Sequence, residues 1–218
     1  MRNPVREGLL VWAAVLAGLA LAQLIPIRGL TGALAVAAFL WAPLRLLERR
    51  DQDAFDAGWR FDKLGADLAW SFGVCALILP LFALGFFSFP SWLARLPLQL
   101  RVLLAPYAGG VSLHAIPWTL DLFGQVAGNA AVAFSEEFFY RGYLTLRFEE
   151  KLRPVPAALA VAGLFALGHL LTPAPFRLLV FFPALLFAFL RNRTRTIVGA
   201  SIAHFLCNVS LLLLQASS

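Results

Sequence analysis

The stretch Phe134–Gly142 reads Phe-Ser-Glu-Glu-Phe-Phe-Tyr-Arg-Gly and has apolar sequence on both sides. Its two adjacent carboxylates and its guanidinium stand in a chain of 218 residues, of which 61% are hydrophobic and 14% are charged. Soluble domains are only about 45–50% apolar, so this excess predicts several membrane spans. Charged side chains at membrane depth are costly and usually face a cavity or one another. The stretch is therefore the first candidate for a functional site.

The apolar runs predict an all-α, polytopic transmembrane helical bundle of about seven spans, with residues 1–218 forming a single integral membrane domain. A helix needs about 20 apolar residues to cross the hydrocarbon layer of a bilayer. Arginine, proline and glycine interrupt residues 91–121, which we therefore expect to be an interfacial or re-entrant segment. The predicted spans are Gly8–Ile27, Leu30–Leu47, Leu68–Pro90, Leu122–Leu146, Val155–Leu171, Leu178–Leu190 and Ile197–Leu214.

The lysine and arginine residues indicate how these spans are oriented. With the N-terminus inside, 13 of the 18 fall in the inside segments and 4 in the outside segments. Because positive residues concentrate in cytoplasmic loops, we expect the N-terminus inside and the C-terminus outside. The net charge of +6 comes from short loops, and no soluble segment carries a basic cluster interleaved with aromatic residues. Nucleic acid is therefore not expected as a partner.

Helical spacing divides the charges of the opening stretch into two sets. Glu137 and Arg141 are four residues apart, so they stack on one helix face and can form an ion pair. Glu136 is rotated by about 100° and shares its face with Tyr140, which leaves its carboxylate for another partner. Two close carboxylates repel, so one of them should keep its proton to a higher pH than a free glutamate. Such a group suits a general base or acid.

Two further polar pairs repeat the four-residue spacing on later spans. Phe165 precedes His169, and His204 precedes Asn208. If Glu136, His169 and His204 converge, they supply a base, a second proton carrier and, with Asn208, a donor array for an oxyanion. The same carboxylate and two imidazoles are also a common catalytic zinc set. The chain has no His-Glu-x-x-His motif, so zinc is not favoured and no cofactor is expected.

The three patterns together resemble the motifs of a known family. Glu136-Glu137-x-x-x-Arg141, Phe165-x-x-x-His169 and His204-x-x-x-Asn208 follow one another on late apolar segments, within residues 120–215. In this order they are similar to the three motifs of the CaaX protease and bacteriocin-processing (CPBP) family, which includes the Ras-converting CaaX prenyl endopeptidases.

The resemblance implies an intramembrane endopeptidase of the glutamic type. Carried over by position, it makes Glu136 and His169 the pair that activates water, and His204 and Asn208 the oxyanion site. Glu137 and Arg141 would support them. Apart from the resemblance, we expect Phe165 to pack beside His169 and orient it, and Tyr140 to be a further supporting residue. The implied partners are the bilayer and a membrane-anchored protein or peptide. This substrate would be cleaved near its membrane segment or C-terminus, as in CaaX-like processing, peptide maturation or removal of a C-terminal anchor or sorting signal. A bacterial inner membrane location is expected.

Two alternatives from other classes stay open at this point. A proton-coupled transporter would use Glu136 and the histidines as a relay, and it would show an inverted repeat, of which the sequence has no sign. A non-enzymatic membrane scaffold or immunity protein would keep the motif residues for helix packing alone.

Overall fold

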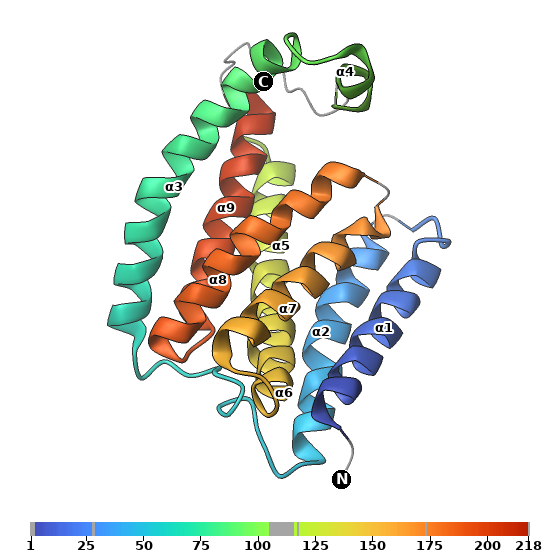
Figure 1. The fold of residues 1–218 in the computed structure, drawn as a ribbon, viewed down its shortest axis with the longest axis vertical. Coiled ribbons are helices and arrows are strands. Elements are labelled where there is room, and N and C mark those ends of the chain that lie inside the picture. Colours follow the sequence, from blue (N-terminus) through green and yellow to red (C-terminus); the bar gives the residue numbers. More distant parts are fainter. Residues whose placement is uncertain (1–2, 28, 105–115, 117, 173, 218) are drawn as a thin grey trace.

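The computed structural model describes residues 3–27, 29–104, 116, 118–172 and 174–217, and all regular secondary structure in these residues is helical (Figure 1). This confirms the all-α prediction for the described part of the chain. The α-helices are α1 (Pro4–Ala22), α2 (Leu30–Glu48), α3 (Leu64–Leu93), α4 (Leu98–Leu104), α5 (Leu120–Glu137), α6 (Thr145–Glu149), α7 (Pro154–Gly168), α8 (Phe181–Thr194) and α9 (Val198–Ser217). A π-helix, η2 (Phe138–Leu144), joins α5 to α6, and two 3₁₀ segments, η3 (His169–Leu171) and η4 (Pro175–Val180), lie between α7 and α8.

The prediction of about seven spans is confirmed in part. Among the described residues, five helical stretches are long and apolar enough to cross a membrane: Pro4–Ala22, Leu30–Glu48, Leu64–Leu93, Pro154–Leu171 and Val198–Ala216. They correspond to the first, second, third, fifth and seventh predicted spans.

The two remaining predicted spans, the fourth and the sixth, do not form the single long α-helix that was expected for each. The fourth, Leu122–Leu146, runs through α5, η2 and α6, and it is not among the five stretches of spanning length and composition. The sixth, Leu178–Leu190, falls mostly in α8, which has 14 residues and is therefore shorter than a hydrocarbon layer is thick. Within residues 91–121, the structure gives the short helix α4, while 105–115 and 117 lie outside the described residues. The interfacial or re-entrant segment thus stays a prediction.

The loops rich in positive charge share one end of the bundle. The start of α1, the α2–α3 loop, the α6–α7 turn and the α8–α9 turn lie at the lower end in Figure 1, whereas the C-terminus lies at the upper end. This arrangement is the one that the predicted distribution of lysine and arginine requires. Which end faces the cytoplasm stays a prediction.

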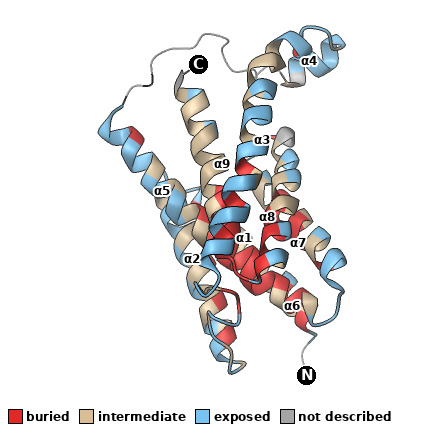
Figure 2. Cartoon of the chain, turned by 90° about the vertical axis from the view of Figure 1, so that its left-hand side faces the viewer, coloured by how far each residue is buried: buried red, intermediate tan, exposed pale blue. Residues whose placement is uncertain are grey.

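The core lies around the junction of α5, η2 and α6. Figure 2 shows the buried residues gathered in the middle and lower part of the bundle, with much of the outer helix surface exposed. All seven residues of η2 are buried, and the side chains of Phe138, Phe139 and Leu144 have no exposed surface. The sequence predicts a regular α-helix here, and the structure corrects this to a π-helix. Its wider turn lets the Thr145 hydroxyl donate to the carbonyl of Tyr140, five residues back, at 2.8 Å. Such π segments are frequent at functional sites.

Glycines set two close contacts in this core. A Cβ added at Gly142 of η2 would lie 2.9 Å from the backbone oxygen of Ala57, in the α2–α3 loop. A Cβ added at Gly168, at the end of α7, would lie 2.8 Å from the Tyr140 hydroxyl. Both positions therefore need a residue without a side chain, and they bring η2 against its neighbours.

Helix α3 lies at the side of the bundle and packs against α9. A buried polar junction holds its first turns: the Thr196 hydroxyl donates to Asp67 at 2.7 Å, and the Ser71 hydroxyl donates to the Gly199 carbonyl at 2.7 Å. Farther along, the thiols of Cys75 and Cys207 contact each other across the same helix pair.

Candidate active site

Glu137 is the centre of a buried charge cluster between α5, η2 and α9. Its Oε1 accepts a hydrogen bond from Nη1 of Arg141 at 2.9 Å and another from Nδ1 of His204 at 2.8 Å. The side chains of Glu137 and Arg141 are 0% and 1% exposed. The ion pair expected from their spacing is thus present, although Arg141 belongs to a π-helix. The contact with His204 joins residues 67 positions apart, which helical spacing within one span does not predict.

His204 lies between the two adjacent carboxylates. While its Nδ1 bonds Glu137, its Nε2 is 3.7 Å from Oε2 of Glu136. The Glu136 side chain is 16% exposed and therefore the more accessible of the two carboxylates. The expected division of the glutamates into a paired and a more open member is observed. The approach of His204 to Glu136 is part of the convergence considered from the sequence, whereas the bond of His204 to Glu137 was not predicted.

Aromatic rings enclose the cluster. The ring of Phe187 on α8 stacks on His204, with centroids 4.7 Å apart and planes at 17°. The Arg141 guanidinium lies 4.6 Å from the centroid of Phe165 and 5.3 Å from that of Phe187, so it is held between two ring faces as a cation–π contact. Its Nη2 also donates to the Ala184 carbonyl at 2.8 Å. Sequence reasoning missed Phe187 and Ala184, which are unremarkable residues of an apolar run until α8 packs on the site.

His169 lies where α7 ends and η3 begins. Its Nδ1 donates to the Phe165 carbonyl at 2.9 Å, and its ring centroid lies 4.5 Å from that of Phe165. A carbonyl can only accept, so a neutral His169 carries its proton on Nδ1 and has a lone pair on Nε2. The Phe165 ring also contacts Tyr140 at 5.0 Å and His204 at 5.8 Å. Phe165 therefore joins the second motif to the other two.

Asn208 lies one turn after His204 on α9 and is half-buried. Its amide has no hydrogen-bond partner in the described part of the chain, whereas every other motif residue has a defined contact. The structure therefore brings Glu136, Glu137, Arg141 and His204 together directly. It links His169 and Tyr140 to them through the ring of Phe165.

The cluster has a simple charge balance. Glu136 and Glu137 carry two negative charges, Arg141 carries one positive charge, and a protonated His204 would complete neutrality in a site with little access to water. In that state both nitrogens of His204 are donors, one held by Glu137 and the other turned toward Glu136. Such an imidazolium can stabilise a negative oxygen that forms beside it.

A metal site is the alternative use of these carboxylate and imidazole groups. Nowhere in the residues that the structure describes are three or more His, Cys, Asp or Glu side chains grouped so that they could hold a metal ion, and this includes Glu136, His169 and His204.

Comparison with known proteins finds one family model that is similar to part of the chain. Residues 117–210 match the family model described as "Rce1-like: Type II CAAX prenyl endopeptidase Rce1-like". No curated protein and no solved structure gives a significant match to the chain. The matched segment contains all three motifs and the whole charge cluster. Through residues 117–210, the chain is thus similar to the Rce1-like group of the CPBP protease family.

Proposed function

We propose that this protein is an intramembrane endopeptidase of the glutamic type, with Glu136 as the general base. The observation that carries the proposal is the pair of unlike carboxylates on either side of His204: Glu137 is sealed by Arg141 and His204, while Glu136 is partly open. A sealed carboxylate paired with a cation is a poor base, because the nearby positive charge favours its charged form. An adjacent, accessible carboxylate can still take a proton from water.

The proposed reaction uses only side chains of this chain and water. Water gives a proton to Glu136, and its oxygen attacks the carbonyl carbon of the scissile peptide bond. The carbonyl oxygen becomes an oxyanion, which accepts hydrogen bonds from Nε2 of His204 and the amide of Asn208. When the intermediate collapses, the C–N bond breaks and the leaving nitrogen takes a proton from Glu136. His169, with its lone pair on Nε2, is the second proton carrier.

The substrate we propose is a membrane-anchored protein or peptide that is cleaved near its membrane segment or C-terminus. The family description names CAAX prenyl endopeptidases, so a prenylated peptide with a C-terminal CaaX sequence is the first probe. The same peptide without its lipid, and a peptide with a C-terminal apolar anchor, would distinguish lipid recognition from recognition of any membrane-anchored chain end.

The decisive test is cleavage of these peptides by purified Glu136→Gln protein in proteoliposomes. We expect a loss of about 10²–10⁴-fold in rate, the usual contribution of a general base. The matched control is Asn129→Ala, which removes a half-buried polar side chain from the same helix α5, two turns away, and should leave the rate unchanged. Both proteins should melt at the wild-type temperature. Undiminished cleavage by folded Glu136→Gln protein would exclude Glu136 as the base.

Metal dependence gives a second test of the same mechanism. A glutamate base and an amide donor need no metal ion, so we expect dialysis against a chelator to leave the cleavage rate unchanged. If the rate falls and zinc restores it, then the carboxylate and imidazoles would instead have to act as ligands.

A further inference from the structure

A groove at the end of the bundle where the chain begins is separate from the charge cluster. Its volume is about 1310 Å³, and it lies between the start of α1, the end of α2 and the turn after α6. None of the motif residues lines it. Its walls come from the same end of the molecule at which the positively charged loops gather.

The carboxylates of this groove are already paired. Glu7 accepts a hydrogen bond from Nη2 of Arg50 at 2.6 Å, and this bond raises the pKa of Arg50 above its ordinary value. Glu150 lies 2.9 Å from Nη1 of Arg147 and 3.6 Å from Nη1 of Arg50. Both glutamates are thus neutralised within the protein.

The remaining cations of the lining have no such partner. Arg6, Arg49 and Lys151 are exposed, and no carboxylate in the described part of the chain forms an ion pair with any of them. They come from three different segments and surround one concave space. This leaves an uncompensated positive charge on the groove, which suits an anionic group such as a phosphate.

The rest of the lining is apolar and continues toward the bilayer. Leu10, Val11 and Leu46 line the groove, and Leu10 is 60% exposed. These residues belong to α1 and α2, which are both long and apolar enough to span a membrane. A soluble phosphate would leave this apolar wall unused, whereas an acyl chain would cover it.

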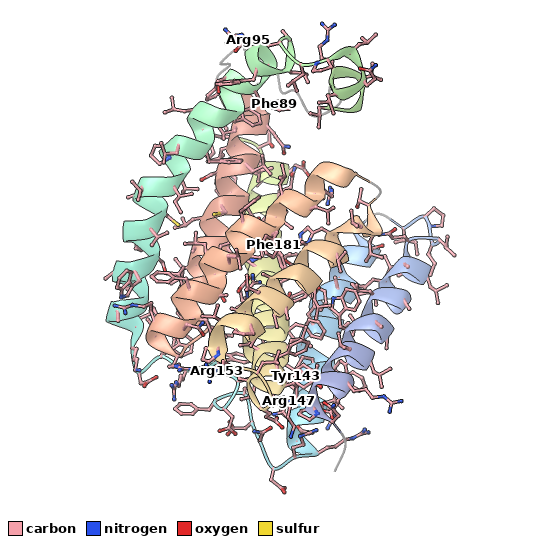
Figure 3. All side chains as sticks on the ribbon, in the orientation of Figure 1. Phe89, Arg95, Tyr143, Arg147, Arg153 and Phe181 are labelled. Atoms are coloured by element: carbon pink, nitrogen blue, oxygen red, sulfur yellow. The ribbon has the colours of Figure 1, made fainter. Side chains whose placement is uncertain are left out.

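The wall behind the cations is firmly held. The hydroxyl of Tyr143 on η2 donates to Glu7 at 3.3 Å, and the side chain of Arg147 is fully buried and bonds Gln52. Figure 3 shows Tyr143 and Arg147 together at this end of the bundle. The residues that form the groove are therefore held by hydrogen bonds to the buried segments η2 and α6.

We propose that this groove binds one anionic glycerophospholipid, with its phosphate between Arg6, Arg49 and Lys151 and an acyl chain along Leu10 and Leu46. Basic pockets between membrane helices at the cytoplasmic side are suited to anionic headgroups, and anionic lipids are concentrated in that leaflet. The predicted orientation places the groove there. This proposal is independent of the proteolytic activity, since it shares no residue with the charge cluster.

The test is the retention of lipid by the purified protein in detergent, measured by native mass spectrometry after addition of dioleoyl phosphatidylglycerol or dioleoyl phosphatidylcholine. We expect the wild-type protein to retain phosphatidylglycerol at least about tenfold better than the neutral lipid. The variant Arg6→Gln/Arg49→Gln/Lys151→Gln should lose this preference. A second variant, Leu10→Trp, keeps all the charges but fills the groove, and it should also lose the lipid.

The control variant Lys63→Gln/Arg153→Gln/Arg193→Gln removes three exposed cations outside the groove, and it should retain the lipid (Figure 3 labels Arg153 at the same end). If the control and groove variants lose phosphatidylglycerol equally, the retention depends only on the total positive charge of the protein, and the proposal is overturned. Displacement of the lipid by millimolar inorganic phosphate or by an acidic peptide would overturn it in favour of a soluble anion or a peptide.

Discussion

Helix α3 and the π-helical segment η2 show opposite relations between polarity and burial. In the 30 residues of α3, the buried residues are Asp67, Ser71, Cys75 and Leu93, and most of the large apolar side chains are exposed. The segment η2 carries Arg141 and follows two glutamates, yet all seven of its residues are buried. In a bilayer the outside of the protein is apolar, so hydrophobicity does not select the core as it does in water. Charge and close packing mark the interior of this protein instead.

The largest loss of stability is expected when a charge is removed from the interior around η2. Arg141→Ala leaves Glu137 buried with its arginine partner gone, and breaking a buried pair in this way costs about 3–5 kcal/mol. We expect a large drop in the melting temperature in detergent. Arg193→Ala is the control, because Arg193 is exposed and lies over Trp70 beside α3, at 4.7 Å from the ring centroid. Similar drops for both variants would contradict the contrast between interior and surface charges.

A smaller loss is expected where α3 meets the interior. Thr196→Val removes the hydroxyl that donates to Asp67 at 2.7 Å and leaves a buried carboxyl oxygen without a donor. This should cost about 1.5–3 kcal/mol, measured as a shift in thermal unfolding. The isosteric control Thr31→Val alters a half-buried hydroxyl of α2 and should change stability by less than about 0.5 kcal/mol. If the two variants melt together, the polar junction does not hold α3.

The smallest effect is expected when one methyl group is added, by a Gly→Ala substitution, in η2 or in α3. At Gly142 of η2 a Cβ would meet the Ala57 carbonyl oxygen at 2.9 Å, whereas at Gly85 of α3 it would meet nothing within 4 Å. Gly142→Ala should therefore destabilise by about 1–3 kcal/mol through overpacking. Gly85→Ala should be neutral or stabilise by up to about 1 kcal/mol through helix propensity. A stabilising Gly142→Ala would show that η2 has more room than its contacts indicate.

Much of the site could be predicted because its motifs repeat within single helices. The four-residue spacing of Glu137 and Arg141 predicts their ion pair, and the same spacing predicts Phe165 beside His169. The π-helix between Phe138 and Leu144 could not be predicted, because its residues have no local pattern that separates it from an α-helix. Its wider turn depends on packing against neighbouring segments, as at Gly142.

The count of spans was predicted less well than their positions. Five of the seven predicted apolar runs are helices of spanning length and composition. In the predicted sixth span, Leu178–Leu190, the first residues form the end of a 3₁₀ segment, and helix α8 begins only at Phe181. Helix α8 alone is therefore too short to cross a membrane. Hydropathy measures how apolar a segment is. It does not show that part of an apolar segment forms a 3₁₀ turn and that the α-helix is shorter than the segment.

The residue pattern was enough to predict the helical character of the described residues, several apolar segments of spanning length and the pairing of Glu137 with Arg141. This was possible because helical spacing and hydrophobic length are local properties of a chain. The position of His204 between Glu136 and Glu137, and the stacking of Phe187 on its ring, became visible only in the folded structure. These contacts join α5, α8 and α9, and their partners are chosen by how helices pack rather than by any pattern within one helix.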